Sequence, residues 1–256
     1  MENNSFMDPN DVPDEYKVPY DIIELPSQGL LYKNKKSSVK VEYLTAYDEN
    51  ILTAPNLLNS GKVLDVLLER KVKDLGFDIK ELISGDRMAI LLYLRTTGLG
   101  NEYQQMVFDS SGTMVPSTVD LTTIKTKNLT IKPDEKNEFD YELPISKKRV
   151  KFRILTQKDE DEIEEINKKL MEKNDNIPTT NSLKLERSIM EIDGERDKMK
   201  ISHILKNLKI MDVRKFNKYI TEIEPGLDLN VVARTQGGES VSTFLRIGRT
   251  FWNPDV

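Results

Sequence analysis

Few side chains in this chain are of the types that catalyse reactions or bind metal ions. There is one histidine, His203, and there is no cysteine. Thiolate zinc sites, disulfides and cysteine nucleophiles are therefore excluded. His203 lies beside an apolar helical stripe that includes Ile201 and Ile204, which indicates packing at a helix surface. No Ser/His/Asp set can be assembled around it. The sequence nominates no catalytic residue, and we expect neither enzymatic activity nor a cofactor.

Two further segments could be taken for ligand sites. Gly98-Leu99-Gly100 resembles a phosphate-binding loop, but it lacks the third glycine and follows a predicted helix. We interpret it as a helix stop. The acidic run over residues 159–165 lies at a predicted helix start, where negative charge is favourable. A solvated helix face explains this run, and a metal or basic-partner site is the alternative. Its spacing does not match a calcium loop.

The composition of the chain restricts the kinds of molecule that we expect it to bind. The 256 residues carry a formal net charge of -5, so the chain as a whole does not attract phosphate backbones. The short lysine clusters are not interleaved with aromatic residues, and we expect no nucleic-acid binding. No apolar run approaches the roughly 20 residues that span a bilayer. The polar, acidic N-terminus lacks the features of a secretory signal, so we expect a soluble protein and no membrane partner.

The first half predicts an arm followed by an α+β unit. Residues 1–19 are polar and form either a flexible N-terminal arm or a partner-binding one. A strand is predicted over 39–44, and Thr45 before two acidic residues predicts a helix start. A buried helix over 84–95 then precedes a β-hairpin over 103–121.

The second half repeats this order after a polar linker over residues 122–138. A strand over 150–155 leads into a helix. A second helix is predicted over 183–192, ending at Asp193-Gly194. Two amphipathic helices follow, and a final hairpin turns at residues 236–238.

The two halves are also alike in sequence. Residues 39–49 and 150–160 are identical at six of eleven positions. Residues 68–72 then match 185–189 in the same order, with extra residues in the second copy near 174–182. The sequence therefore predicts an α+β fold of two tandem related units, over 20–121 and 139–256. Each has a short strand region, a small helix cluster and a β-hairpin. Such a duplication suits a scaffold or connector.

Four aromatic residues are the candidates for binding a partner. Trp252 is the only tryptophan and follows Phe251, so this pair either packs in a core or anchors an interface. Tyr16 and Tyr20 lie in or beside the N-terminal arm.

The order of several short motifs resembles that of baseplate hub proteins and baseplate hub assembly proteins of T4-like bacteriophages. No single motif is specific, but together they run through residues 20–256. The motifs are Leu25–Tyr32, Leu44–Leu52, Gly85–Ile90, Phe152–Thr156 and Phe251–Asp255.

The resemblance implies a structural or assembly component of a contractile phage tail baseplate, in the hub region. It would act by contact with other baseplate or tail proteins, in the host cytoplasm during assembly and then in the virion tail. The alternative is a tail assembly chaperone for a tape-measure or hub protein, absent from the mature virion. A nucleic-acid-binding module derived from a ribbon-like ancestor is a third hypothesis, disfavoured by the acidic charge and the absent cysteines.

The resemblance also bears on metal binding. Some relatives carry cysteine pairs at the hairpin turns, as in a zinc ribbon. The corresponding turns here, 109–112 and 235–238, contain no cysteine, so we predict no metal. Hydrogen bonds and the packing of Phe108 and Phe244 are expected to hold the hairpins instead.

Overall fold

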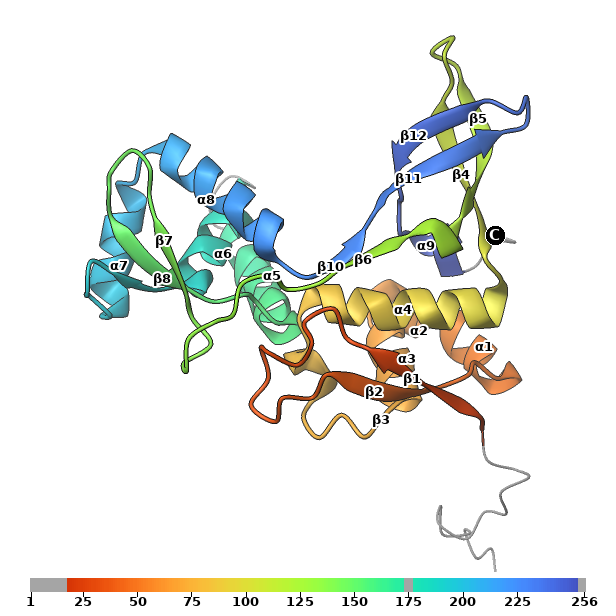
Figure 1. Cartoon of the computed structure of the whole chain (residues 1–256), viewed down its shortest axis with the longest axis horizontal. Helices are drawn as coiled ribbons and strands as arrows, with labels where there is room; N and C mark the ends of the chain where they lie inside the picture. The colour runs from red at the N-terminus through yellow and green to blue at the C-terminus, as the bar shows by residue number, and fades with distance from the viewer. Residues whose placement is uncertain (1–17, 173–176, 253–256) are drawn as a thin grey trace, which may run out of the picture.

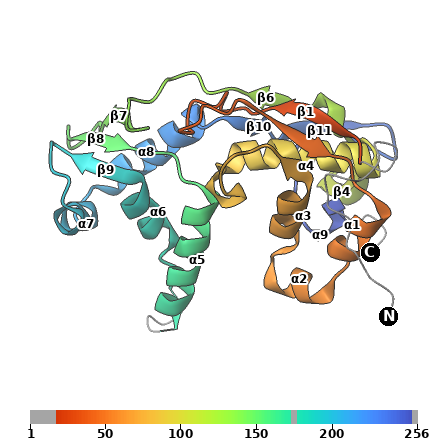
Figure 2. The ribbon, with the colours of Figure 1, turned by 90° about the horizontal axis from the view of Figure 1, so that it is seen from below.

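The computed structural model describes residues 18–172 and 177–252. The molecule is elongated, with one group of helices and strands at each end (Figures 1 and 2). Two separate clusters of buried apolar side chains form its two cores. The predicted α+β class is confirmed.

The first unit places a three-stranded antiparallel sheet beside four helices. Its strands, in the spatial order β1-β2-β3, are β1 (Tyr20–Glu24), β2 (Ser38–Glu42) and β3 (Val72–Lys73). Its helices are α1 (Ala46–Leu52), α2 (Pro55–Ser60), α3 (Val63–Lys71) and α4 (Ser84–Leu99). Val41, Leu67 and Leu94 are fully buried between these layers. The predicted buried helix is therefore confirmed as α4, which ends just before Gly100 as expected.

The second unit has the same plan. Its sheet, in the order β7-β8-β9, contains β7 (Phe139–Glu142), β8 (Arg149–Phe152) and β9 (Ile189–Ile192). Its helices are α5 (Gln157–Met171), α6 (Thr180–Ser188), α7 (Lys198–Lys206) and α8 (Ile210–Ile223). Phe152 and Phe216 meet edge to face in its core, with ring centroids 5.1 Å apart.

Matching helix starts support the predicted duplication. Thr45 and Thr156 are N-caps whose helices carry an aspartate in the third position, and both form a capping box. The two aspartates, Asp48 and Asp159, also meet an arginine at the end of a later helix. Arg70 Nε lies 2.9 Å from Asp48, and Arg187 Nε lies 3.2 Å from Asp159. The same sequence pattern therefore fixes the same helix pair in both units.

A second pair of aspartates extends the correspondence. Asp86 and Asp212 are the third residues of α4 and α8, and both are fully buried. Asp86 accepts a hydrogen bond of 2.8 Å from Ser27 N, and Asp212 accepts bonds from Ile145 N and Ser146 N. Each carboxylate thus ties the start of a helix to the turn after the first strand. The sequence comparison missed this pair because a single aspartate gives little signal.

The structure corrects one secondary-structure prediction. The helix expected over 183–192 ends at Ser188, and residues 189–192 form strand β9 beside β8. Ile189 and Ile192 are β-branched and are buried in the sheet, which favours the strand. The equivalent segment of the first unit is β3, which pairs with β2 in the same way.

The segment expected to be a linker contains structure. Residues 121–123 form a short 3-10 helix, η3, and strand β6 (Lys125–Lys127) pairs with β10 (Gly226–Asp228). Leu129 is buried in the second core. The chain therefore crosses between the two cores twice, and the two crossings are hydrogen-bonded to each other (Figure 1).

The two hairpins join in one sheet. The strands are β4 (Glu102–Phe108), β5 (Met114–Asp120), β11 (Asn230–Thr235) and β12 (Ser240–Phe244), in the order β12-β11-β5-β4. Beside this sheet lies the short helix α9 (Arg249–Trp252). Val231 and Ala233 belong to the first core. The hairpin of the predicted second unit therefore packs with the first unit, because β11 completes the edge that β5 offers.

The environment of Asp159 predicts that this carboxylate contributes to the stability of the fold in a pH-dependent way. Burial alone would raise its pKa, but hydrogen bonds from Arg153 and Thr156 outweigh burial and hold the pKa at about 2, below its ordinary 3.8. A depressed carboxyl pKa stabilises the fold above pH 4, and this stabilisation is lost as pH falls through 2. Asp159→Asn should lower the free energy of unfolding by about 2 kcal/mol at pH 7, and by much less near pH 2.

Urea unfolding at several pH values measures this difference. Glu165→Gln, at an exposed pair with Lys169, is the control and should change the unfolding free energy little at any pH. A deficit for Asp159→Asn that stays constant down to pH 2 would contradict the assigned role of the carboxylate.

Candidate functional site

The four-stranded sheet has one face packed on the protein and one face open. Side chains along β4 alternate strictly between exposed and buried. Tyr103, Val107 and Val119 point to the packed face and join the first core. The ring of Tyr103 meets that of Phe251 on α9 with centroids 5.1 Å apart. Antiparallel sheets often have one solvated face, but that face is normally polar.

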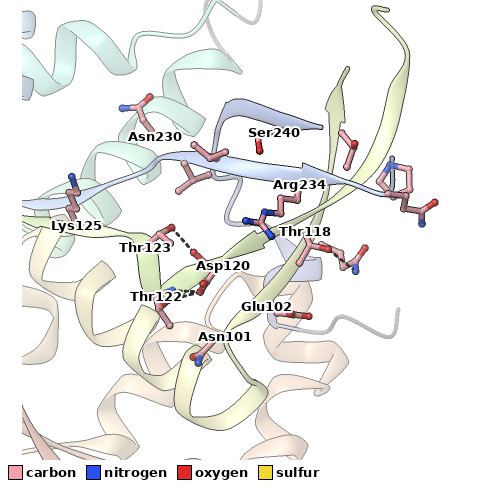
Figure 3. Close-up of a pocket in the computed structure, with 16 residues that line it drawn as sticks. Asn101, Glu102, Thr118, Asp120, Thr122, Thr123, Lys125, Asn230, Arg234 and Ser240 are labelled. Carbon is pink, nitrogen blue, oxygen red and sulfur yellow. Dashed lines mark hydrogen bonds between the residues drawn. The ribbon is translucent and has the colours of Figure 1, made fainter. Parts of the chain in front are cut away.

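A polar row crosses the centre of the open face. Gln104, Thr118, Arg234 and Ser240 are neighbours in register across all four strands, and Figure 3 shows Thr118, Arg234 and Ser240 beside one another. Gln104 Nε2 donates to Thr118 Oγ1 at 3.3 Å. The row borders a hollow of about 950 Å³, which extends past Asp120 to the start of β6. The hollow forms where η3 separates β5 from β6.

The side chains of this hollow suit contact better than catalysis. Asp120 accepts hydrogen bonds from Thr122 N at 2.9 Å and from Thr122 Oγ1 at 2.6 Å. These bonds lower the pKa of Asp120, so its carboxylate is a weak base. Glu102, Lys125 and Arg234 add charges of both signs along the open face. Within residues 18–172 and 177–252, no three His, Cys, Asp or Glu side chains cluster so as to hold a metal ion.

Apolar side chains gather where the β4–β5 hairpin projects from the body (Figure 1). Phe108 pairs in register with Met114, and Met106 pairs with Pro116. The exposed fractions are 57% for Phe108, 47% for Met114 and 44% for Met106. We call these four residues the tip patch. The tip patch is thus a contiguous apolar surface on a projecting hairpin.

The turn of this hairpin is held rigidly. Asp109 Oδ1 accepts hydrogen bonds from Ser111 N, Ser111 Oγ and Thr113 N, at 2.6–2.9 Å. Gly112 adopts φ of 78°, in the left-handed region that favours glycine. Ser110 N donates to Glu239 Oε1 at 3.1 Å, which joins this turn to the turn of the β11–β12 hairpin. A rigid turn presents the tip patch in a fixed geometry.

The same contacts bear on the expectation that these turns hold no metal. The Asp109 carboxylate is engaged by the turn itself, and the neighbouring Ser110 and Gly238 offer no strong metal ligand. The Glu239 carboxylate at the other turn likewise accepts a hydrogen bond, from Ser110 N, and the absence of a metal at these turns stays a prediction. The predicted hydrogen bonding is present, but the predicted packing of Phe108 and Phe244 is wrong. Both rings are 57% exposed because they point to the open face.

The three predicted partner-binding residues that the structure describes do not form one site. Phe251 and Trp252 are 0% and 9% exposed in the first core, which favours core packing over the interface alternative. Tyr20 is half-exposed on β1, with Lys40 Nζ 5.1 Å from its ring centroid. Tyr16 lies outside the described residues. A role for Tyr20 in binding stays a prediction.

The tip patch was missed although the sequence held a signal for it. Met106-Val107-Phe108 places three apolar residues in succession on a strand. Because side chains alternate along a strand, such a run puts apolar groups on both faces of the sheet. Only Val107 is needed for the core.

No protein-family model, curated protein or solved structure matches this chain. Among the residues that the structure describes, no helix is both long and apolar enough to cross a bilayer.

Proposed function

We propose that this protein is a structural or assembly component of a contractile phage tail baseplate, in the hub region. It works by contact with other baseplate or tail proteins rather than by catalysis. The order of motifs along residues 20–256 supports the choice of system. The tip patch is the observation that supports the mode of action, because it offers an apolar contact surface on a rigid, projecting hairpin.

The energetics of the tip patch favour a protein partner. A large apolar side chain gains about 1.5–3 kcal/mol when it is fully buried, and Phe108, Met106 and Met114 are each about half exposed. Burying the rest of these three side chains would contribute a few kcal/mol to an interface. The polar row beside them supplies hydrogen-bonding groups for a rim.

Phe108→Ser tests the tip patch directly. Since Phe108 makes no core contact, the variant should keep its thermal unfolding midpoint within about 2 °C while reducing baseplate-bearing tails at least tenfold. Tails are counted by electron microscopy in cells infected with phage that carry the variant gene. Phe244→Ser is the matched control, because this residue has the same type and the same exposed fraction but lies outside the tip patch.

Two results would contradict the proposal. One is normal tail assembly with Phe108→Ser, and the other is normal assembly after deletion of the gene.

Mass spectrometry of purified virions separates the two forms of the proposal. A fixed ratio to hub subunits identifies a structural component, whereas presence in lysate with absence from virions identifies the tail assembly chaperone.

A further inference from the structure

A second surface, far from the tip patch, combines positive charge with exposed apolar groups. It lies where α7 meets α8, at the opposite end of the molecule (Figures 1 and 2). We call it the α7–α8 corner. It consists of Lys206, Lys209, Ile210, Met211, Arg214 and Lys215, all of them exposed. Ile210 is 66% exposed and Met211 is 45% exposed.

The charge of this corner is not balanced locally. Residues 198–223 contain seven Lys or Arg residues and two acidic residues, in a chain of net charge -5. Of the two acidic residues, Asp212 is buried and engaged by backbone N–H groups. Glu222 pairs with Lys218. Within the described parts of the chain, none of the four cations of the corner has a carboxylate within ion-pair distance. The corner therefore attracts negative charge.

The internal repeat shows what kind of group covers the equivalent place. Asp86 and Asp212 occupy the same position in α4 and α8, so Gly85 corresponds to Met211. In the first unit, an extended segment lies directly on Gly85. A Cβ built on Gly85 would be 1.8 Å from Pro225 O. In the second unit, Met211 is exposed. Met211 carries a long side chain where Gly85 has none, so a segment that covers the α7–α8 corner must lie farther from the helix, over the Met211 side chain.

The chain itself contains an acidic segment of suitable chemistry. Residues 1–17 include five acidic residues and one lysine, together with Phe6, Met7 and Tyr16. These residues precede β1, which lies in the unit away from α7 and α8 in both views (Figures 1 and 2). This placement favours the corner of a neighbouring copy over the corner of the same chain.

We propose that residues 1–17 of one copy bind the α7–α8 corner of a second copy. The acidic side chains meet Lys206, Lys209, Arg214 and Lys215, and the apolar side chains cover Ile210 and Met211. The two surfaces in contact differ, so the association is heterologous and either closes into a ring or continues as a chain.

Charge exchange in the full-length protein tests this contact. Sedimentation velocity from low to high micromolar concentration, in 50 mM salt, should show species larger than a monomer. Lys209→Glu with Lys215→Glu should weaken this association at least tenfold, and so should Asp11→Lys with Asp14→Lys. All four substitutions together should restore it, because the exchanged charges attract again.

Matched controls separate this contact from general charge effects. Lys33→Glu with Lys132→Glu changes the net charge equally at exposed sites elsewhere and should leave association unchanged. Raising the salt to 500 mM should weaken the wild-type association about tenfold, because screening shortens the reach of exposed charges. A monomer at every concentration would overturn the proposal. It would also be overturned if the corner variant lost association while the Asp11/Asp14 variant kept it. Failure of the quadruple variant to regain association would overturn it too.

Discussion

Replacing Arg95 by methionine is expected to lower the free energy of unfolding by about 4 kcal/mol. Arg95 is 1% exposed in the centre of the first core. Its Nε donates to Phe251 O at 2.6 Å, its Nη1 to Gly100 O at 2.6 Å, and its Nη2 to Glu102 O at 3.1 Å. Burial lowers the pKa of this guanidinium. Methionine would fill much of the volume but leave three carbonyl groups without their donor, and the carbonyl of Phe251 among them is buried.

The loss of the Arg95 hydrogen bonds should be detected most directly at α9. Arg95 links α4 both to α9 and to the start of β4. Trp252 on α9 is the only tryptophan of the chain, so its fluorescence reports on the docking of this helix. In the Arg95→Met variant we expect red-shifted emission before the main unfolding transition. Arg234→Met, on the open face of the same sheet, is the control and should change stability little. Wild-type stability and emission in Arg95→Met would disprove this linking role of Arg95.

Replacing Gly85 by alanine should cost about 3 kcal/mol and lower the thermal midpoint by about 9 °C. The new methyl group would lie 1.8 Å from Pro225 O, which is backbone and cannot rotate away. Helix α4 and strand β10 would have to separate. Alanine gains about 1 kcal/mol of helix propensity over glycine, and this gain offsets only part of the loss.

Alanine substitutions at two other glycines give a graded comparison with Gly85→Ala. A Cβ at Gly226 would lie 3.1 Å from the Cα of Gly85, so Gly226→Ala should destabilise less than Gly85→Ala. A Cβ at Gly248 would meet nothing within 4 Å, and Gly248→Ala should have little effect. Calorimetry gives the three midpoints. Equal midpoints for Gly85→Ala and Gly248→Ala would show that the close approach of α4 and β10 does not limit stability.

Local signals in the sequence predicted local structure well. Thr45 and Thr156, each followed by an aspartate three residues later, located two helix starts. The turns at 109–112 and 236–238 located both hairpins. The identities between residues 39–49 and 150–160 indicated the repeat. Each of these features depends on residues a few positions apart, which interact whatever the rest of the chain does.

Long-range pairing could not be predicted in the same way. Nothing in the sequence of β5 specifies that its free edge pairs with β11, which follows more than a hundred residues later. The same limitation hid β9, because its strand conformation depends on the neighbour β8. The tip patch was missed since Met106-Val107-Phe108 was interpreted only as a strand. The sequence shows that such side chains are apolar, but only the fold shows which of them remain uncovered.

The shared sheet has a consequence for the order of folding during synthesis. Val119 of β5 pairs with Ala233 of β11, and Phe251 closes the same core. While the ribosome is still making the second unit, the first unit has an unpaired β5 edge and an uncovered side of α4. Such an edge is a hazard for aggregation, and the pairing that covers it closes a long loop and is slow. The core that is started first is therefore completed last, after all residues of the second core have been made.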